Sequence, residues 1–293
     1  MIKSPLMSRL RLGARIRELR DERKLTGDQL GAQTGLGRIA ISRLERGERR
    51  PRLAAVLKVL DAFGIPDSSE EYRTLVRVAR AADEGGWWEA AEYAGMGERQ
   101  AMTADIESGT TTIREYQIVM PPGLLQTEAY ARERAEATRD DGWQIDVEGT
   151  VEGRLRRQRQ ITDPGGSAYE AIVEELAIRR VLGSEEVMEA QLRHLLEMGA
   201  RRNVDVRVLP VDARPRRGRV PRSPFSLYTY ADPGDPLIVA VDTVAEDLLV
   251  TDQGDAAKYA HLYDRLCAVA LSTEDSAALI HQVAEQLAAE VRA

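Results

Sequence analysis

The residue types that most often act in catalysis are few and scattered in this chain of 293 residues. His194, His261 and His281 fall on predicted helices without H-x-x-x-H or H-E-x-x-H spacing, which favours satisfied or solvent-facing side chains over metal ligands. The single cysteine, Cys267, lies in an apolar stretch and is interpreted as a buried, inert thiol. No phosphate-binding glycine loop or nucleophile elbow occurs. We therefore predict no catalytic residues, no metal and no cofactor, and a protein that is not an enzyme.

Arginine is the chemically active residue type that clusters. One group spans residues 38–50, a second lies on a predicted helix (Arg154, Arg156, Arg157 and Arg159), and a third occupies the Pro/Gly-rich loop 214–222. Guanidinium groups pair with phosphate and carboxylate oxygens through parallel hydrogen bonds. The second and third groups could contact DNA phosphate or an acidic partner. A solvated, salt-bridged face is the ordinary interpretation of the second group, and the role of the third stays open.

The charge is divided unevenly along the chain. Residues 1–66 contain 15 Lys and Arg against 7 Asp and Glu, a net charge of +8. Subtraction from the totals of 41 and 48 leaves 26 basic against 41 acidic residues, a net charge of −15, for residues 67–293. This asymmetry is typical of a basic, phosphate-binding module joined to an acidic domain, although chance clustering of surface charge gives the same sums.

The first arginine group lies within a predicted four-helix bundle. Leu12, Ile16 and Leu19 form the apolar stripe of a first helix, and Thr26 is a good N-cap for a second helix over residues 27–34. Glycines at 35 and 37 predict a tight turn with positive φ. A third helix over 38–46 ends at Gly47, and residues 53–60 form a fourth. Two short helices that meet at a glycine turn, braced on both sides, predict a helix-turn-helix bundle.

Residues 10–65 resemble the phage-repressor (xenobiotic-response-element) class of helix-turn-helix domains. The resemblance rests on the specific run T-x-x-x-L-x-x-x-T-G-x-x-x-x-x-I-S-x-L-E-x-G-x-x-x-P, from Thr26 to Pro51. It implies that Arg38, Ile39 and Arg43 face base edges in the major groove. It also implies that other side chains contact phosphates, namely Ser42, Arg46, Arg49 and Arg50.

The same resemblance implies a structural ion pair between Arg20 and Glu45, which ties the first helix to the third. Two positions depart from the family pattern: Gly27 replaces a common phosphate-binding glutamine, and Gly37 replaces the usual Ser or Thr cap of the recognition helix. Both departures indicate weaker anchoring on DNA. A helical bundle used for protein contacts is the alternative, and the basic face of the third helix disfavours it.

Residues 67–99 are interpreted as a helical connector, and residues 100–293 as an α+β domain. Short β-branched or aromatic runs predict strands at 114–120, 168–173, 204–209, 225–230, 237–242 and 247–251, and longer segments predict helices at 126–138, 147–161, 185–202, 255–271 and 274–292. The last four strands follow one another closely, which predicts an antiparallel meander with helices on one side of the sheet.

The C-terminal region is similar to a domain found in a large actinobacterial family of antitoxin-like regulators. The similarity covers roughly residues 87–271 and rests on MPPGLLQTEAYAR, RLRRQR, EELAIRRVLGSEEVMEAQLRHLLEM and VDVRVLPVD. It implies a small protein partner encoded nearby and a role in development or antibiotic synthesis. Members often carry a tyrosine–glutamate pair where this chain reads Val239 to Asp242, so a site at that place is in doubt here.

Together these patterns predict a mainly α N-terminal helix-turn-helix bundle (1–66) followed by an α+β C-terminal domain with an antiparallel-rich sheet. The expected function is a sequence-specific transcriptional regulator that binds double-stranded DNA as a homodimer and whose C-terminal domain senses a small-molecule effector or docks a small protein. An antitoxin-like protein that mainly captures a small partner is the alternative, and an enzyme localised by its DNA-binding domain is a third. No secretory signal or membrane-spanning run occurs, so the expected location is the cytoplasm.

Overall fold

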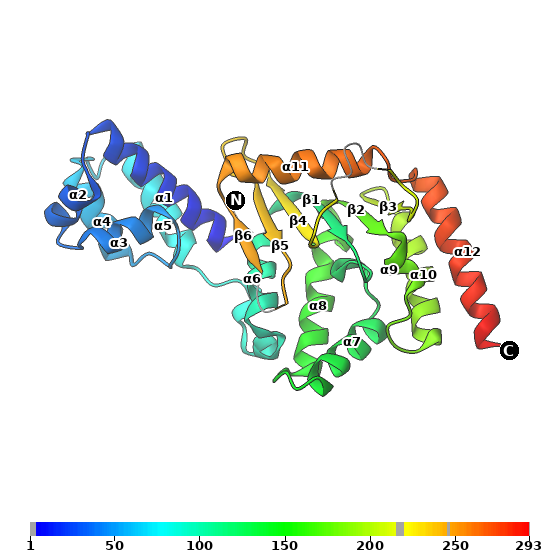
Figure 1. Cartoon of the computed structure of the whole chain (residues 1–293). Coiled ribbons are helices and arrows are strands. Elements are labelled where there is room, and N and C mark those ends of the chain that lie inside the picture. Colours follow the sequence, from blue (N-terminus) through cyan, green and yellow to red (C-terminus); the bar gives the residue numbers. More distant parts are fainter. Residues whose placement is uncertain (1–3, 215–219, 245–246, 293) are drawn as a thin grey trace. The chain divides into compact units, whose positions relative to one another are not determined.

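The computed structural model describes residues 4–214, 220–244 and 247–292 (Figure 1). The chain forms two compact units, Met1–Glu89 and Ala90–Ala293. None of the helices within the described ranges combines the length and the apolar content needed to cross a bilayer.

The first unit is a helical bundle. Its helices are α1 (Pro5–Glu22), α2 (Gly27–Thr34), α3 (Arg38–Glu45), α4 (Leu53–Ala62) and α5 (Glu70–Asp83), followed by the short 3-10 helix η1 (Trp87–Glu89). The predicted apolar residues of the first four helices meet in one core, which also takes in Leu75 and Ala79 of α5. Arg15 of α1 binds Glu71 of α5, with Nη2 2.5 Å from Oε1. Part of the predicted connector is therefore packed into the bundle.

The second unit contains all six predicted strands. In chain order its elements are η2 (Ala91–Met96), α6 (Gly97–Glu107), β1 (Thr110–Gln117), η3 (Gly123–Leu125), α7 (Glu128–Asp140), α8 (Val147–Thr162), β2 (Ala168–Glu174), α9 (Glu175–Arg179), α10 (Glu185–Gly199), β3 (Val204–Leu209), β4 (Phe225–Tyr230), β5 (Ile238–Val241), β6 (Leu248–Val250), α11 (Gln253–Cys267) and α12 (Thr273–Val291). The predicted fold class, a helical helix-turn-helix bundle followed by an α+β domain, is confirmed.

The strands form one mixed sheet in the order β3-β2-β1-β4-β5-β6. β4, β5 and β6 continue antiparallel from β1, whereas β2 and β3 pair in parallel on its other side. The predicted four-strand meander is therefore wrong for β3, which lies at the opposite edge from β6. The cause is the long crossover through α9 and α10, because a connection of that length returns the chain to the same end of the sheet and yields a parallel pair.

Helices cover both faces of this sheet, so the expectation of helices on one side is also wrong. On one face Tyr116, Ile172 and Phe225 pack against α11. On the other, the Tyr230 hydroxyl donates to the Ile106 carbonyl of α6, and Gln160 of α8 donates to Ser167 Oγ at the start of β2. Figure 1 shows α11 along one face and α8 on the opposite side. Coverage of both faces explains why Thr111 is the single exposed residue of the two strands β1 and β2.

The α8 face of the sheet holds a buried carboxyl group. Glu115 lies in the middle of β1, where its Oε2 accepts a hydrogen bond from the Tyr169 hydroxyl at 2.5 Å and its Oε1 accepts one from Gln117 Nε2 at 2.8 Å. Burial raises the pKa of Glu115 to about 7, and the two hydrogen bonds offset only part of that effect. The carboxyl group therefore takes up a proton near neutral pH.

Replacement of Glu115 by Gln should flatten the dependence of stability on pH. The pKa of Glu115 is higher in the folded chain than in the unfolded one, so its proton stabilises the fold below about pH 4.5, and this contribution is lost as the pH rises through about 7. At about 1.4 kcal/mol per pKa unit, wild type should lose about 2 kcal/mol more than Glu115→Gln between pH 5 and pH 8. Urea unfolding of both proteins at the two pH values measures this difference, and parallel profiles would contradict the assignment.

Candidate nucleic-acid interface

Two glycines bring the backbones around α3 into close contact. A Cβ at Gly13 of α1 would lie 2.4 Å from the Glu45 carbonyl oxygen and 2.7 Å from that of Leu44. A Cβ at Gly31 of α2 would lie 2.7 Å from the carbonyl carbon of Gly37 and 2.8 Å from the Arg38 nitrogen. At each end of α3 the neighbouring helix therefore approaches the α3 backbone more closely than a residue with a Cβ atom would allow. The sequence analysis missed both residues, although a glycine inside a predicted helix is a signal of close packing.

The turn between α2 and α3 is built as the sequence predicts. Thr26 and Gln29 form a reciprocal capping box at the start of α2. Gly35 has φ 67° and Gly37 has φ 78°, and both values lie in the region that favours glycine. Gly37 stands immediately before α3, with no side-chain cap. The positive φ explains why this chain departs from the usual Ser or Thr at that position.

Arg20 and Glu45 form a bidentate ion pair between α1 and α3. Arg20 Nε lies 2.6 Å from Glu45 Oε1, and Nη2 lies 3.2 Å from Oε2. Arg20 Nη1 also donates to the Leu25 carbonyl at 2.9 Å, so the same guanidinium holds the loop before α2. The hydrogen bonds that Arg20 donates to Glu45 raise the pKa of Arg20 above its ordinary value. With side chains only 14% and 12% exposed, the pair is screened little by solvent.

The outward face of α3 carries the residues that the sequence assigns to base contacts. Ile41 points into the core, whereas Arg38, Ile39 and Arg43 are exposed. Ile39 is 69% exposed, so its side chain is accessible to a ligand. Arg38 Nη1 lies 3.5 Å from Asp28 Oδ2 of α2. Sequence reasoning missed this carboxylate.

The four residues assigned to phosphate contacts lie on α3 or in the loop after it. Two of these arginines form ion pairs with carboxylates. Arg46 Nη1 donates to Ser42 Oγ at 2.7 Å, and its Nε lies 2.5 Å from Glu48 Oε1. Arg50 pairs with Glu89 of η1. Within the described ranges no carboxylate pairs with Arg43 or Arg49, so their guanidinium groups are available for a ligand.

The other arginine groups behave differently from the first. Arg157 of α8 is bound through two nitrogens to Glu107, with Nη2–Oε1 2.6 Å and Nε–Oε2 2.9 Å, and its side chain is 11% exposed. Arg154 donates to the buried amide of Gln126. The interpretation of this group as a solvated face is therefore wrong for these two residues. In the loop 214–222, residues 215–219 lie outside the described residues.

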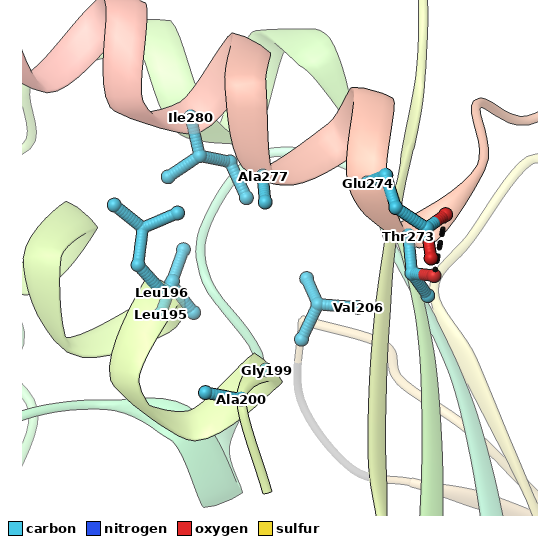
Figure 2. Close-up of a pocket in the computed structure, with 9 residues that line it drawn as sticks. All are labelled: Leu195, Leu196, Gly199, Ala200, Val206, Thr273, Glu274, Ala277 and Ile280. Carbon is cyan, nitrogen blue, oxygen red and sulfur yellow. Dashed lines mark hydrogen bonds between the residues drawn. The ribbon is translucent and has the colours of Figure 1, made fainter.

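An apolar groove of about 260 Å³ lies between α10, α12 and β3 (Figure 2). Leu195, Val206 and Ile280 line it, and its polar side chains, Thr273 and Glu274, hydrogen-bond to each other at 3.1 Å. The groove therefore lacks converging ionisable groups that could do catalysis. Among the described residues, no group of three or more His, Cys, Asp or Glu is placed to hold a metal ion.

Comparison with known proteins identifies both parts of the chain. Residues 11–72 match a family described as a helix-turn-helix domain, and residues 100–282 match the family described as a domain of unknown function, DUF5753. The chain belongs to the DUF5753 family. Both resemblances found in the sequence, to a helix-turn-helix class and to a regulator C-terminal domain, are thereby confirmed.

Relatives of this DUF5753 protein carry names that refer to transcription. Uncharacterized HTH-type transcriptional regulators of Mycobacterium bovis and Mycobacterium tuberculosis are 27% identical over 242 residues, which cover 72% of this chain and 93% of theirs. The HTH-type transcriptional repressor RghR of Bacillus subtilis is 40% identical over 62 residues, 21% of this chain and 46% of its own. No solved structure matches the chain with significance.

Replacement of Gly13 by Ala should destabilise the first unit. The new methyl group would overlap the carbonyl groups that end α3, and relief of such overpacking costs about 1–3 kcal/mol. Gly27→Ala is the matched control, because its nearest neighbour would be Arg38 Cγ at 4.0 Å and alanine favours helix. Thermal or urea unfolding should show a loss for Gly13→Ala alone. Equal stability of the two variants would mean that α1 and α3 are not held by this contact.

Proposed function

We propose that this protein is a sequence-specific, DNA-binding transcriptional regulator that inserts α3 into the major groove. The observation that carries the proposal is the exposed α3 face formed by Arg38, Ile39 and Arg43. An arginine at this place can bind guanine O6 and N7 through two hydrogen bonds, and an isoleucine suits the methyl group of thymine. The match to a helix-turn-helix family and the names of the relatives support the same function.

Phosphate contacts are proposed for Ser42, Arg46, Arg49 and Arg50, which lie on α3 or directly after it. Such contacts fix the position of a domain on DNA without reading its sequence. The net charge of +8 on residues 1–66 supports them, because affinity for DNA grows with the number of phosphates that a protein neutralises.

The proposed active form is a homodimer on a palindromic site. One helix-turn-helix module contacts only a few base pairs, and regulators of this class gain affinity and specificity from two half-sites about one helical turn apart. The C-terminal domain is proposed to control DNA affinity through a small-molecule effector or a small protein partner. Size-exclusion chromatography with light scattering tests the dimer, and co-purification tests the protein partner.

Removal of the base-facing arginines should change which sequences are bound. We expect Arg38→Ala and Arg43→Ala each to cost about 1–3 kcal/mol on the preferred site while affecting random DNA much less. Arg49→Ala, in contrast, should weaken binding to all sequences similarly and should lower the slope of log affinity against log salt by about 1. Selection from a random DNA library, followed by binding titrations at several salt concentrations, measures both effects.

The double variant Arg38→Ala/Arg43→Ala is the control for the selection itself. Enrichment of one short site by wild type and its loss in the double variant would support the proposed docking of α3. If the double variant kept the full preference of wild type, the assignment of α3 as the recognition helix would be wrong.

Removal of the carboxylate beside Arg38 should strengthen DNA binding. Asp28 lies 3.5 Å from Arg38 Nη1, so near DNA it would both compete for the guanidinium and repel phosphate. We expect Asp28→Asn to raise affinity several-fold at low salt, with a smaller gain at high salt. Asp61→Asn, which removes an exposed charge from α4, is the matched control. Equal gains from both variants would indicate a general effect of net charge, and no gain would remove Asp28 from the interface.

A further inference from the structure

The groove between α10, α12 and β3 is large enough to hold a small molecule (Figure 2). Its walls include the buried side chains of Leu195, Val206 and Ile280, one from each element. Ala200 and Ala277 also line it and are exposed, so the groove opens to solvent beside them. Its volume of about 260 Å³ lies just below the range of about 300–1,000 Å³ that is typical of sites for drug-sized ligands, so it suits a smaller molecule.

The open edge of the sheet faces this groove. β3 is the first strand in the sheet order and pairs only with β2. Tyr169 of β2 donates its backbone N–H to the carbonyl of Asn203, directly before β3, at 2.8 Å. Along a strand the backbone groups of successive residues point alternately to the two sides. The N–H and C=O groups of Val204, Val206 and Val208 therefore point away from β2, toward α12.

Two of these three residues have partners for the N–H groups on this edge. The N–H of Val208 donates to Ser276 Oγ of α12 at 2.8 Å, and its carbonyl accepts from the N–H of Leu271 at 2.9 Å. The N–H of Val204 donates to the Arg201 carbonyl at 3.2 Å.

The backbone groups of Val206 lie between these two anchored positions. In the described part of the chain, neither its N–H nor its C=O has a hydrogen-bond partner across the edge. The residue is only 5% exposed, so these groups are shielded from bulk water. A shielded backbone donor and acceptor without partners cost free energy, and a ligand that supplies both partners removes that cost.

The charge at the groove disfavours an anion. Of the residues known to line it, only Glu274 is charged, and its carboxylate accepts a hydrogen bond from the Thr273 hydroxyl. Hydrogen bonds from its own backbone N–H and from Thr273 lower the pKa of Glu274, so it is ionised at neutral pH. A ligand carboxylate or phosphate would be repelled by this group.

We propose that the groove binds a small neutral molecule with an apolar body and an amide-like end, which donates to the Val206 carbonyl and accepts from the Val206 N–H. The apolar body would replace water against Leu195 and Ile280. The site deepens the proposed function, because it gives the chemical class of the effector, and it rests on that function only for the effector's role in regulation.

The free stretch of the edge is too short to add a strand. An added strand gains affinity from several successive backbone hydrogen bonds. Here the N–H groups of Val204 and Val208, on either side of Val206, are already taken by the Arg201 carbonyl and by Ser276. A single donor and a single acceptor remain at Val206, which fits the polar end of a small molecule.

An unfilled packing gap predicts different behaviour. In that case a larger side chain at position 277 would fill the gap and raise stability, as cavity-filling substitutions do. A small amide added to the protein would then give no saturable response.

The test is a titration of the isotope-labelled full-length protein with hexanamide, followed by proton–nitrogen correlation spectra. We expect the Val206 amide resonance to move downfield and to saturate, because its N–H gains an acceptor. N,N-dimethylhexanamide keeps the acceptor and lacks the donor, so it should bind about threefold to tenfold more weakly. Hexanoate should bind more weakly than hexanamide, because it is charged and lacks the donor.

Ala277→Leu should weaken hexanamide binding about tenfold or more, because the leucine side chain occupies the space of the ligand. Ala278→Leu is the matched control, since it adds the same side chain at the next exposed position of α12, outside the groove lining. It should bind as wild type does.

Three results would each overturn the proposal. The first is the lack of a saturable shift at Val206 in wild type. The second is equal affinity for hexanamide, N,N-dimethylhexanamide and hexanoate, which would remove the role of the backbone groups. The third is equal affinity of Ala277→Leu and Ala278→Leu for hexanamide.

The DNA library selection separates this result from the proposed function. Hexanamide binding without an enriched DNA site would leave the ligand site standing and remove the regulator. An enriched site without hexanamide binding would do the reverse.

Discussion

At Gly13 the backbone of α1 lies against the carbonyl groups of Leu44 and Glu45, so close that a single methyl group would not fit between them. Two turns further along α1, Arg20 binds the side chain of Glu45. At the other end of α3, Gly31 of α2 lies against Gly37 and Arg38. The direction in which Arg38 and Arg43 point is therefore set by contacts made through backbone atoms and one shielded ion pair. Such contacts leave the backbone of α3 little freedom, so in the proposed complex with DNA no further entropy is lost in ordering the helix itself.

The second unit depends on a different constraint, the burial of β1 on both faces. Successive side chains of a strand point to opposite faces, so Tyr116 packs toward α11 while Glu115 and Gln117 point toward α8. Polar groups buried in this way require partners. Tyr169 supplies one for Glu115, and Arg157 supplies one for Glu107.

The sequence predicts these features unequally. Local patterns were sufficient for the six strands, the glycine turn at 35–37 and the caps, because each depends on residues a few positions apart. The sheet order was not predictable in the same way, since the place of β3 depends on the path of α9 and α10 rather than on its own residues. The amphipathic pattern of α8 also failed to show that Arg157 points inward, because its partner Glu107 lies 50 residues earlier in the chain. The carboxylates that pair with two of the arginines proposed to contact DNA, Asp28 with Arg38 and Glu89 with Arg50, come from other elements and were missed for the same reason.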